Sequence, residues 1–226
     1  MIHIIGHRGA KGFLAENTLE SFRKAIDLGA NAIELDVHIC ATGEIVVLHD
    51  FTVDRTTNGF GEVHKYTLSE LKKLKVEELY RIPLLEEVLD LVAGKCWVNI
   101  ELKGHGTAEP VAELIKKYVD EKSWTYDEFI VSSFQKEELK RIKKQNPEIP
   151  IGVLSQASVE QAIDWAEQLS AKAIHPHFSL LTEDNCKEAH AKGYSIFTWT
   201  VNEEEDIRRV KALGVDGIIS DFPNRL

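Results

Sequence analysis

Short apolar runs alternate with longer stretches that carry apolar residues at helical spacing along almost the whole chain. Each short run predicts a buried strand, and each longer stretch predicts an amphipathic helix that packs against the strands. The predicted strands are residues 2–6, 31–38, 45–49, 97–102, 128–133, 150–154, 172–176, 194–201 and 216–220. The predicted helices are residues 17–28, 84–93, 109–121, 136–145, 158–168, 182–191 and 203–213, with a weaker one near 68–75.

This alternation is typical of parallel strands joined by right-handed helical crossovers. Only residues 41–43 separate the runs 31–38 and 45–49, whereas a parallel crossover needs about a dozen residues. We therefore expect 45–49 to fold back as an antiparallel hairpin strand. The other predicted strands are then enough for a closed eight-stranded α/β barrel, which their number and the chain length favour over an open doubly wound sheet.

Several helix ends carry recognisable signals. Asn17 with Glu20, and Thr67 with Glu70, have the spacing of a capping box at a helix N-terminus. Glycines that fit helix C-termini follow three of the periodic segments, at Gly29, Gly193 and Gly214. No linker divides the chain, so we expect a single domain over residues 1–226. Residues 51–83 show little regular periodicity, which predicts a small insertion. The insertion either carries functional residues or is a surface loop without a function.

Composition narrows the choice of partners. The 226 residues include 27 Lys and Arg against 37 Asp and Glu, a net charge of −10, which argues against nucleic acid or an anionic membrane as a partner. Cys40, Cys96 and Cys186 form neither a disulfide framework nor a zinc signature. Neither a signal peptide nor an apolar run of about 20 residues is visible. We expect a cytoplasmic protein without a membrane span.

Acidic residues repeat at alternate positions of two predicted strands. Glu34 and Asp36 share one face of the strand 31–38, with apolar residues between and after them. Glu101 and Lys103 repeat the pattern at the end of 97–102, the next parallel strand of the predicted barrel. Acids facing solvent would explain one such strand, but inward acids on both strands favour a divalent cation bound by three carboxylates. Lys103 would then face an anion or a metal-bound oxygen at the same place.

Two histidines are expected beside these acids. His7 and Arg8 follow the first strand between glycines, which is typical of an anion-binding turn, although a generic turn fits too. The hairpin brings His49 opposite the acids of the second strand. Paired imidazoles suit acid–base chemistry because their pKa lies near neutrality.

Residues nearer the C-terminus give weaker indications of function. Trp199 either walls a small-molecule pocket or belongs to the core, and His175-Pro176-His177 favours a structural turn over a rim or second metal site.

Together these residues resemble the glycerophosphodiester phosphodiesterase family, and in particular its cytoplasmic bacterial type. The matching motifs, in chain order, are Gly6-His7-Arg8-Gly9, Glu16-Asn17-Thr18, Glu34-Leu35-Asp36-Val37, His49-Asp50, Asp54-Arg55-Thr56-Thr57-Asn58-Gly59, Ile82-Pro83, Glu101-Leu102-Lys103, Thr198-Trp199-Thr200-Val201-Asn202 and Ser220-Asp221-Phe222-Pro223. They run from end to end, so the resemblance covers essentially the full chain. Its departures, at Ala15, Val53 and Leu85, touch no expected ligand.

The resemblance implies a TIM-type (β/α)8 barrel and one divalent cation, Mg²⁺ or Ca²⁺, held by Glu34, Asp36 and Glu101. It implies that His7 and His49 are the general acid and base. It also implies that Arg8 and Lys103 hold phosphate and that Trp199 faces glycerol. The implied reaction is hydrolysis of a glycerophosphodiester to sn-glycerol 3-phosphate and an alcohol. A metal-dependent sugar isomerase and a non-catalytic binding protein are the alternatives.

Overall fold

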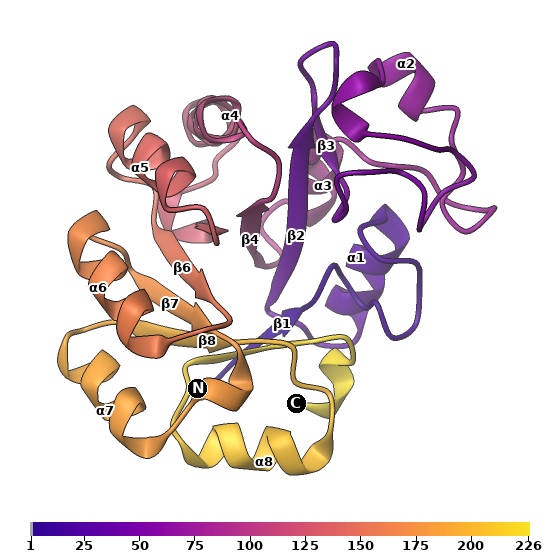
Figure 1. Ribbon diagram of the computed structural model, residues 1–226. Helices are drawn as coiled ribbons and strands as arrows, with labels where there is room; N and C mark the ends of the chain where they lie inside the picture. Colours follow the sequence, from indigo (N-terminus) through magenta and orange to yellow (C-terminus); the bar gives the residue numbers. More distant parts are fainter. Residues whose placement is uncertain (1) are drawn as a thin grey trace.

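Strands and helices alternate along residues 2–226, which are the residues that the computed structural model describes (Figure 1). The strands are β1 (His3–Gly6), β2 (Ala32–Ile39), β3 (Ile45–Val47), β4 (Trp97–Leu102), β5 (Phe129–Ser133), β6 (Ile151–Ser155), β7 (Ala173–Pro176), β8 (Ser195–Thr198) and β9 (Gly217–Ser220). The α-helices are α1 (Leu19–Asp27), α2 (Leu68–Leu71), α3 (Leu85–Val92), α4 (Ala108–Glu121), α5 (Lys136–Gln145), α6 (Val159–Leu169), α7 (Glu183–Ala191) and α8 (Glu204–Ala212). Short 3₁₀ helices are η1 (Val63–Lys65), η2 (Tyr126–Glu128), η3 (Phe178–Leu180) and η4 (Pro223–Arg225).

Eight of the strands close into a ring. Parallel pairing runs in the order β1-β9-β8-β7-β6-β5-β4-β2, and β2 pairs back with β1. The remaining strand, β3, lies outside the ring and pairs antiparallel with β2, Val37 opposite Val47. The closed barrel of the TIM type and its extra hairpin strand are therefore confirmed, and the open sheet is excluded. Helices surround the ring in Figure 1, as right-handed crossovers require.

The strands of the ring are buried on both faces. On β2, Leu35 and Val37 pack in the apolar layer between the strands and the helices. The alternation of side chains then turns Glu34 and Asp36 into the ring, where both are buried. Apolar side chains fill the interior below them. They are Ile5, Ala32, Ile130, Ala173, Phe197 and Ile219, with Trp97 and Trp199 packed against them. The carboxylates of Glu34 and Asp36 therefore lie above these apolar side chains, at a polar end of the interior.

The first helix begins one residue later than a cap at Asn17 requires. Thr18 is the N-cap of α1, and its hydroxyl accepts a hydrogen bond from the Ser21 amide at 3.2 Å. The capping box predicted at Asn17 and Glu20 is therefore wrong, because Asn17 adopts a left-handed backbone with φ 58°. The box at Thr67 is confirmed. The helix-terminal glycines are confirmed as well, with positive φ at Gly29, Gly193 and Gly214.

The chain between β3 and α3 forms a unit beside the ring, around α2 in Figure 1. Its short helix α2 ends at Leu71, earlier than the predicted 75. The unit has its own apolar cluster, which includes Val53, Leu71 and Ile82 and packs against Val46 of β3. It is thereby fixed to the edge of the barrel next to β2. Along residues 2–226, no helix combines the length and apolarity needed to cross a membrane.

Candidate active site

Three carboxylates converge where β2 and β4 pair side by side. Asp36 is in register with Glu101 across these parallel strands, and Glu34 is in register with Asn99. One oxygen from each of the three acids lies within 4.8 Å of the others, and all three side chains are buried. The structure thus brings together the acids that the sequence analysis expected as metal ligands.

Three negative charges cannot share this space without compensation. Burial and the charge of Asp36 raise the pKa of Glu34 well above its ordinary value, and the same causes raise the pKa of Glu101 to about 7. Among the described residues, Oδ1 of Asp36 has no hydrogen-bond partner. Carboxylate oxygens so arranged suit a hard divalent cation, which would favour the ionised form of all three. The residues therefore fit such an ion.

The turn after β1 and the start of α1 orient these carboxylates. The backbone N–H of Arg8 donates to Oε2 of Glu34 at 2.8 Å. The Asn17 amide donates to Oδ2 of Asp36 at 2.9 Å, and its oxygen accepts from the Asp36 backbone at 3.4 Å. The left-handed conformation of Asn17, which asparagine tolerates better than most residues, makes this contact possible.

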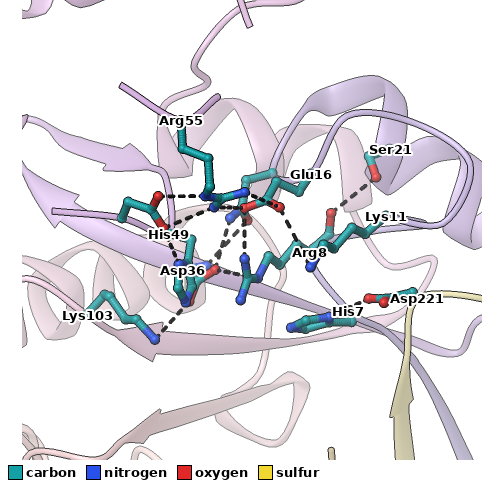
Figure 2. Close-up of polar contacts among 12 residues, drawn as sticks. His7, Arg8, Lys11, Glu16, Ser21, Asp36, His49, Arg55, Lys103 and Asp221 are labelled. Carbon is teal, nitrogen blue, oxygen red and sulfur yellow. Dashed lines mark hydrogen bonds and ion pairs between the residues drawn. The ribbon is translucent and has the colours of Figure 1, made fainter. Parts of the chain in front are cut away.

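Two cations flank the acids (Figure 2). The Lys103 ammonium lies 2.8 Å from Oε1 of Glu101 and 3.8 Å from Oδ1 of Asp36. Burial alone would lower the pKa of Lys103, but the charges of Glu101 and Asp36 raise it overall. Nη1 of Arg8 donates to Glu16 at 2.8 Å, and its Nε lies 3.4 Å from Oδ2 of Asp36. Both cations are therefore held ionised at the edge of the acidic cluster.

His7 is paired with a carboxylate from the last strand's end. Nδ1 of His7 lies 2.6 Å from Oδ1 of Asp221. Asn202 fixes that carboxylate, because its amide donates to Oδ2 at 2.8 Å and its oxygen accepts from the Asp221 backbone at 2.9 Å. Burial lowers the pKa of His7, and the hydrogen bond to Asp221 opposes this effect. The pKa of His7 is lowered overall, and the hydrogen bond to Asp221 holds the imidazole in one orientation.

His49 is paired with a carboxylate in the same way. Its Nδ1 lies 2.5 Å from Oδ1 of Asp50, and its backbone oxygen lies 3.2 Å from Nε2 of His38. The hairpin places it here, since the Leu48 amide donates to the Asp36 backbone oxygen at 3.0 Å. Burial lowers the pKa of His49, while the charge of Asp36 raises it.

A cavity of about 370 Å³ joins these groups. Its lining includes the charged and polar side chains described above and Asn99, namely His7, Arg8, Glu34, His49, Asn99, Glu101 and Lys103. The other lining residues are Phe134, Leu154, Gln156, Trp199, Thr200 and Ile219. Trp199 follows β8, and its ring edge meets Phe134 with the centroids 5.5 Å apart. Trp199 therefore both lines the cavity and packs against the apolar interior of the ring.

The segment around His175 differs from the expected turn. His175 lies within β7, fully buried inside the ring, and only His177 begins a turn, where it caps η3. Neither ring nitrogen of His175 has a hydrogen-bond partner in the described part of the chain, and burial lowers its pKa to about 3. It faces Gly152, where a Cβ would lie 2.3 Å from Nε2. The predicted turn is therefore wrong for this residue.

Sequence reasoning gave no active-site role to four residues that the structure places in the site. They are Asn17, Asp50, Asn202 and Asp221. Each lies in a motif that was recognised, but its partner is remote or lies on a loop. Only the closed ring shows, for example, that Asp221 meets His7, 214 positions away.

Comparison with known proteins tests the resemblance suggested by the sequence. The profile of the Glycerophosphoryl diester phosphodiesterase family matches residues 7–225. The chain belongs to this family. The family predicted from the motifs is thereby confirmed, and with it the class of enzyme.

Relatives cover the whole chain. A glycerophosphodiester phosphodiesterase of Caldanaerobacter subterraneus is 40% identical, with 99% of this chain and 95% of that protein covered. One from Bacillus altitudinis is 37% identical, with 100% and 96% covered. Among solved structures, an Oleispira antarctica phosphodiesterase in complex with the product sn-glycerol-3-phosphate superposes with a TM-score of 0.89 at 29% identity, covering 99% of this chain and 94% of that one.

Proposed function

We propose that this protein hydrolyses glycerophosphodiesters, such as deacylated phospholipids, to sn-glycerol 3-phosphate and an alcohol. The observation that carries the proposal is one cavity lined by both imidazoles and by acids of the carboxylate trio. The product held by the Oleispira antarctica relative supports the same class of substrate. The loss of an acid or imidazole that a non-catalytic relative would show is not seen here.

The cation proposed for Glu34, Asp36 and Glu101 is Mg²⁺ or Ca²⁺, because all three ligands are carboxylates. When bound, it supplies positive charge that polarises the phosphoryl group and stabilises charge developing there. Asn17 and the Arg8 backbone hold two of the ligands in place.

Arg8 and Lys103 are the proposed phosphate ligands. Both line the cavity, and both lie against the acidic cluster. Once the charge of that cluster is neutralised, the ammonium and guanidinium groups are free to bind phosphate oxygens. Trp199 also lines the cavity, where its ring offers an apolar face to the glycerol carbons.

His7 and His49 are the proposed general acid and base. Each directs Nδ1 to a carboxylate, which leaves Nε2 to exchange a proton with substrate. One imidazole takes the proton of the nucleophile, and the other donates a proton to the leaving alkoxide. The nucleophile is water or the neighbouring glycerol hydroxyl, and the latter route passes through a cyclic phosphate that phosphorus NMR would detect.

The test is release of glycerol 3-phosphate from glycerophosphocholine. Activity should disappear with a chelator and return when Mg²⁺ or Ca²⁺ is restored. His7→Ala and His49→Ala should each lower kcat at least about a hundredfold. The matched control is His64→Ala, which removes an exposed histidine of the insertion. Activity of either imidazole variant within tenfold of the wild type would remove that residue from the acid–base role.

Two further expectations stay predictions from the sequence. One is a cytoplasmic location, and the other is a small-molecule partner rather than nucleic acid, which the net charge of −10 favours. Both follow from composition, not from the geometry of the site.

A further inference from the structure

Arg55 connects the insertion to both sides of the active site. Its Nη1 and Nη2 donate to the two oxygens of Glu16 at 3.1 and 2.6 Å. Its Nε and Nη2 donate to the two oxygens of Asp50 at 2.7 and 3.0 Å. One guanidinium group thus binds two carboxylates, each through two hydrogen bonds (Figure 2).

Each of these carboxylates contacts a residue of the proposed machinery. Asp50 accepts the hydrogen bond of His49 Nδ1. Glu16 accepts a hydrogen bond from Nη1 of Arg8. A continuous chain of polar contacts therefore runs from His49 through Arg55 to Arg8. Arg55 itself does not line the cavity, so its effect on the substrate would be indirect.

The electrostatics show that both carboxylates depend on Arg55. Burial would raise the pKa of Glu16, but hydrogen bonds from Arg55 and the charge of Arg8 lower it to about 2. The hydrogen bonds from Arg55 are also the largest cause of the lowered pKa of Asp50. Without the guanidinium, Asp50 would have no fixed orientation, because only His49 would remain as its side-chain partner.

We propose that Arg55 is a positioning residue that holds Asp50, and through it His49, in the orientation required for proton transfer. This inference rests on the acid–base role proposed for His49. The insertion supplies Arg55, so its packing against β3 is what delivers the guanidinium to the site. Arginine suits this position because its planar fork binds two carboxylates at once, which a lysine ammonium cannot do with the same geometry.

The first experiment compares Arg55→Ala and Arg55→Lys with the wild type, using the cation-loaded full chain. Arg55→Ala should lower kcat about tenfold to hundredfold, the size typical for loss of an outer hydrogen-bond partner. KM should change much less, since Arg55 lies outside the cavity. Arg55→Lys should lower kcat by a smaller factor than Arg55→Ala. Guanidinium ion, added well below denaturing concentrations, should restore activity to Arg55→Ala.

A double-mutant cycle separates positioning from general support of the fold. In an Asp50→Asn background, Arg55→Ala should add little further loss of kcat, because the contact it makes is already impaired. Guanidinium ion should not restore activity to Asp50→Asn. Equal losses in both backgrounds would overturn the proposal, as would a raised KM with an unchanged kcat.

Controls keep the two proposals apart. Arg81→Ala removes another arginine of the insertion, which donates to the Lys72 backbone oxygen at 2.8 Å, and should leave kcat unchanged. His49→Ala is assayed alongside. If His49→Ala is inactive while Arg55→Ala and Arg55→Lys keep wild-type kcat, the inference about Arg55 alone is wrong. If His49→Ala keeps activity within tenfold of the wild type, the acid–base role proposed for His49 is wrong, and the inference about Arg55 falls with it. If Arg55→Ala does not fold, Arg55→Lys replaces it in the double-mutant cycle with Asp50→Asn.

Discussion

Asn17 and Thr18 are adjacent residues whose side chains contact different parts of the molecule. The left-handed backbone of Asn17 directs its amide to Asp36, inside the ring. Thr18 is extended, and its hydroxyl accepts from the Ser21 amide at the start of α1. One residue therefore orients a proposed metal ligand, while the next stabilises a helix. Both polar types are common at helix starts, so the sequence could not separate them.

The two residues should respond differently to substitution. Thr18→Ala should lower the free energy of unfolding by about 1 kcal/mol, the usual effect of losing an N-cap, with little change in activity. Asn17→Gly keeps the backbone free to adopt positive φ and removes only the side chain. It should weaken activation by Mg²⁺ or Ca²⁺ about tenfold to hundredfold, because Asp36 loses its orienting partner.

Urea unfolding and metal titrations of activity measure the two effects. The assignment of Asn17 would be contradicted if Asn17→Gly were activated at the same metal concentration as the wild type. Thr18→Ala is the matched control in that titration.

At the scale of single elements, the carboxylate trio depends on the register between β2 and β4. The sequence placed the acids on one face of each strand through their alternation with apolar residues. The pairing of Asp36 with Glu101 then follows from how far each strand is shifted along its neighbour. A one-residue shift would turn one set of acids away from the other. Periodicity predicts the face, but pairing decides which residues are adjacent.

Strand β7 has a buried histidine that should make stability depend on pH. His175 has a pKa of about 3 in the folded chain, lowered by burial from an ordinary 6.5. Below pH 6.5 the unfolded chain binds a proton that the folded chain rejects. Stability from this residue is therefore present above pH 6.5 and is lost as the pH falls toward 3, by up to about 1.4 kcal/mol per pH unit.

His175→Leu should remove that part of the pH dependence. Urea unfolding of the metal-free chain at pH 7 and pH 5 would show a smaller loss of stability for the variant than for the wild type. His64→Gln removes an exposed histidine and should keep the wild-type loss. Equal losses for His175→Leu and the wild type would mean that the imidazole is not held neutral.

At the scale of the whole molecule, the metal site should couple to stability. Three carboxylates within 4.8 Å of one another repel in the metal-free chain, as the raised pKa values of Glu34 and Glu101 indicate. A cation that binds only the folded chain adds its binding free energy to the free energy of unfolding.

Mg²⁺ or Ca²⁺ should therefore raise the Tm. At a free concentration one hundred times Kd, the gain is about 2.7 kcal/mol. Glu34→Gln should remove most of this response, and in chelator its Tm should equal or exceed that of the wild type because a neutral amide replaces a buried carboxyl group beside two others. Calorimetric scans with chelator and with each metal measure both effects. The same metal response in Glu34→Gln and the wild type would contradict the assignment of Glu34 as a ligand.

The sequence by itself determined which segments are strands and helices, which strand turns back as a hairpin, and which acids and histidines gather at the barrel mouth. These features are local, since they depend on side-chain periodicity, loop length and the common direction of parallel strands. The tertiary structure decided the partners: Asp221 for His7, Asn17 for Asp36, and Arg55 between Asp50 and Glu16. Such contacts join loops that are brought together by closure of the ring and by packing of the insertion. No local sequence pattern shows which of these loops lie close to one another.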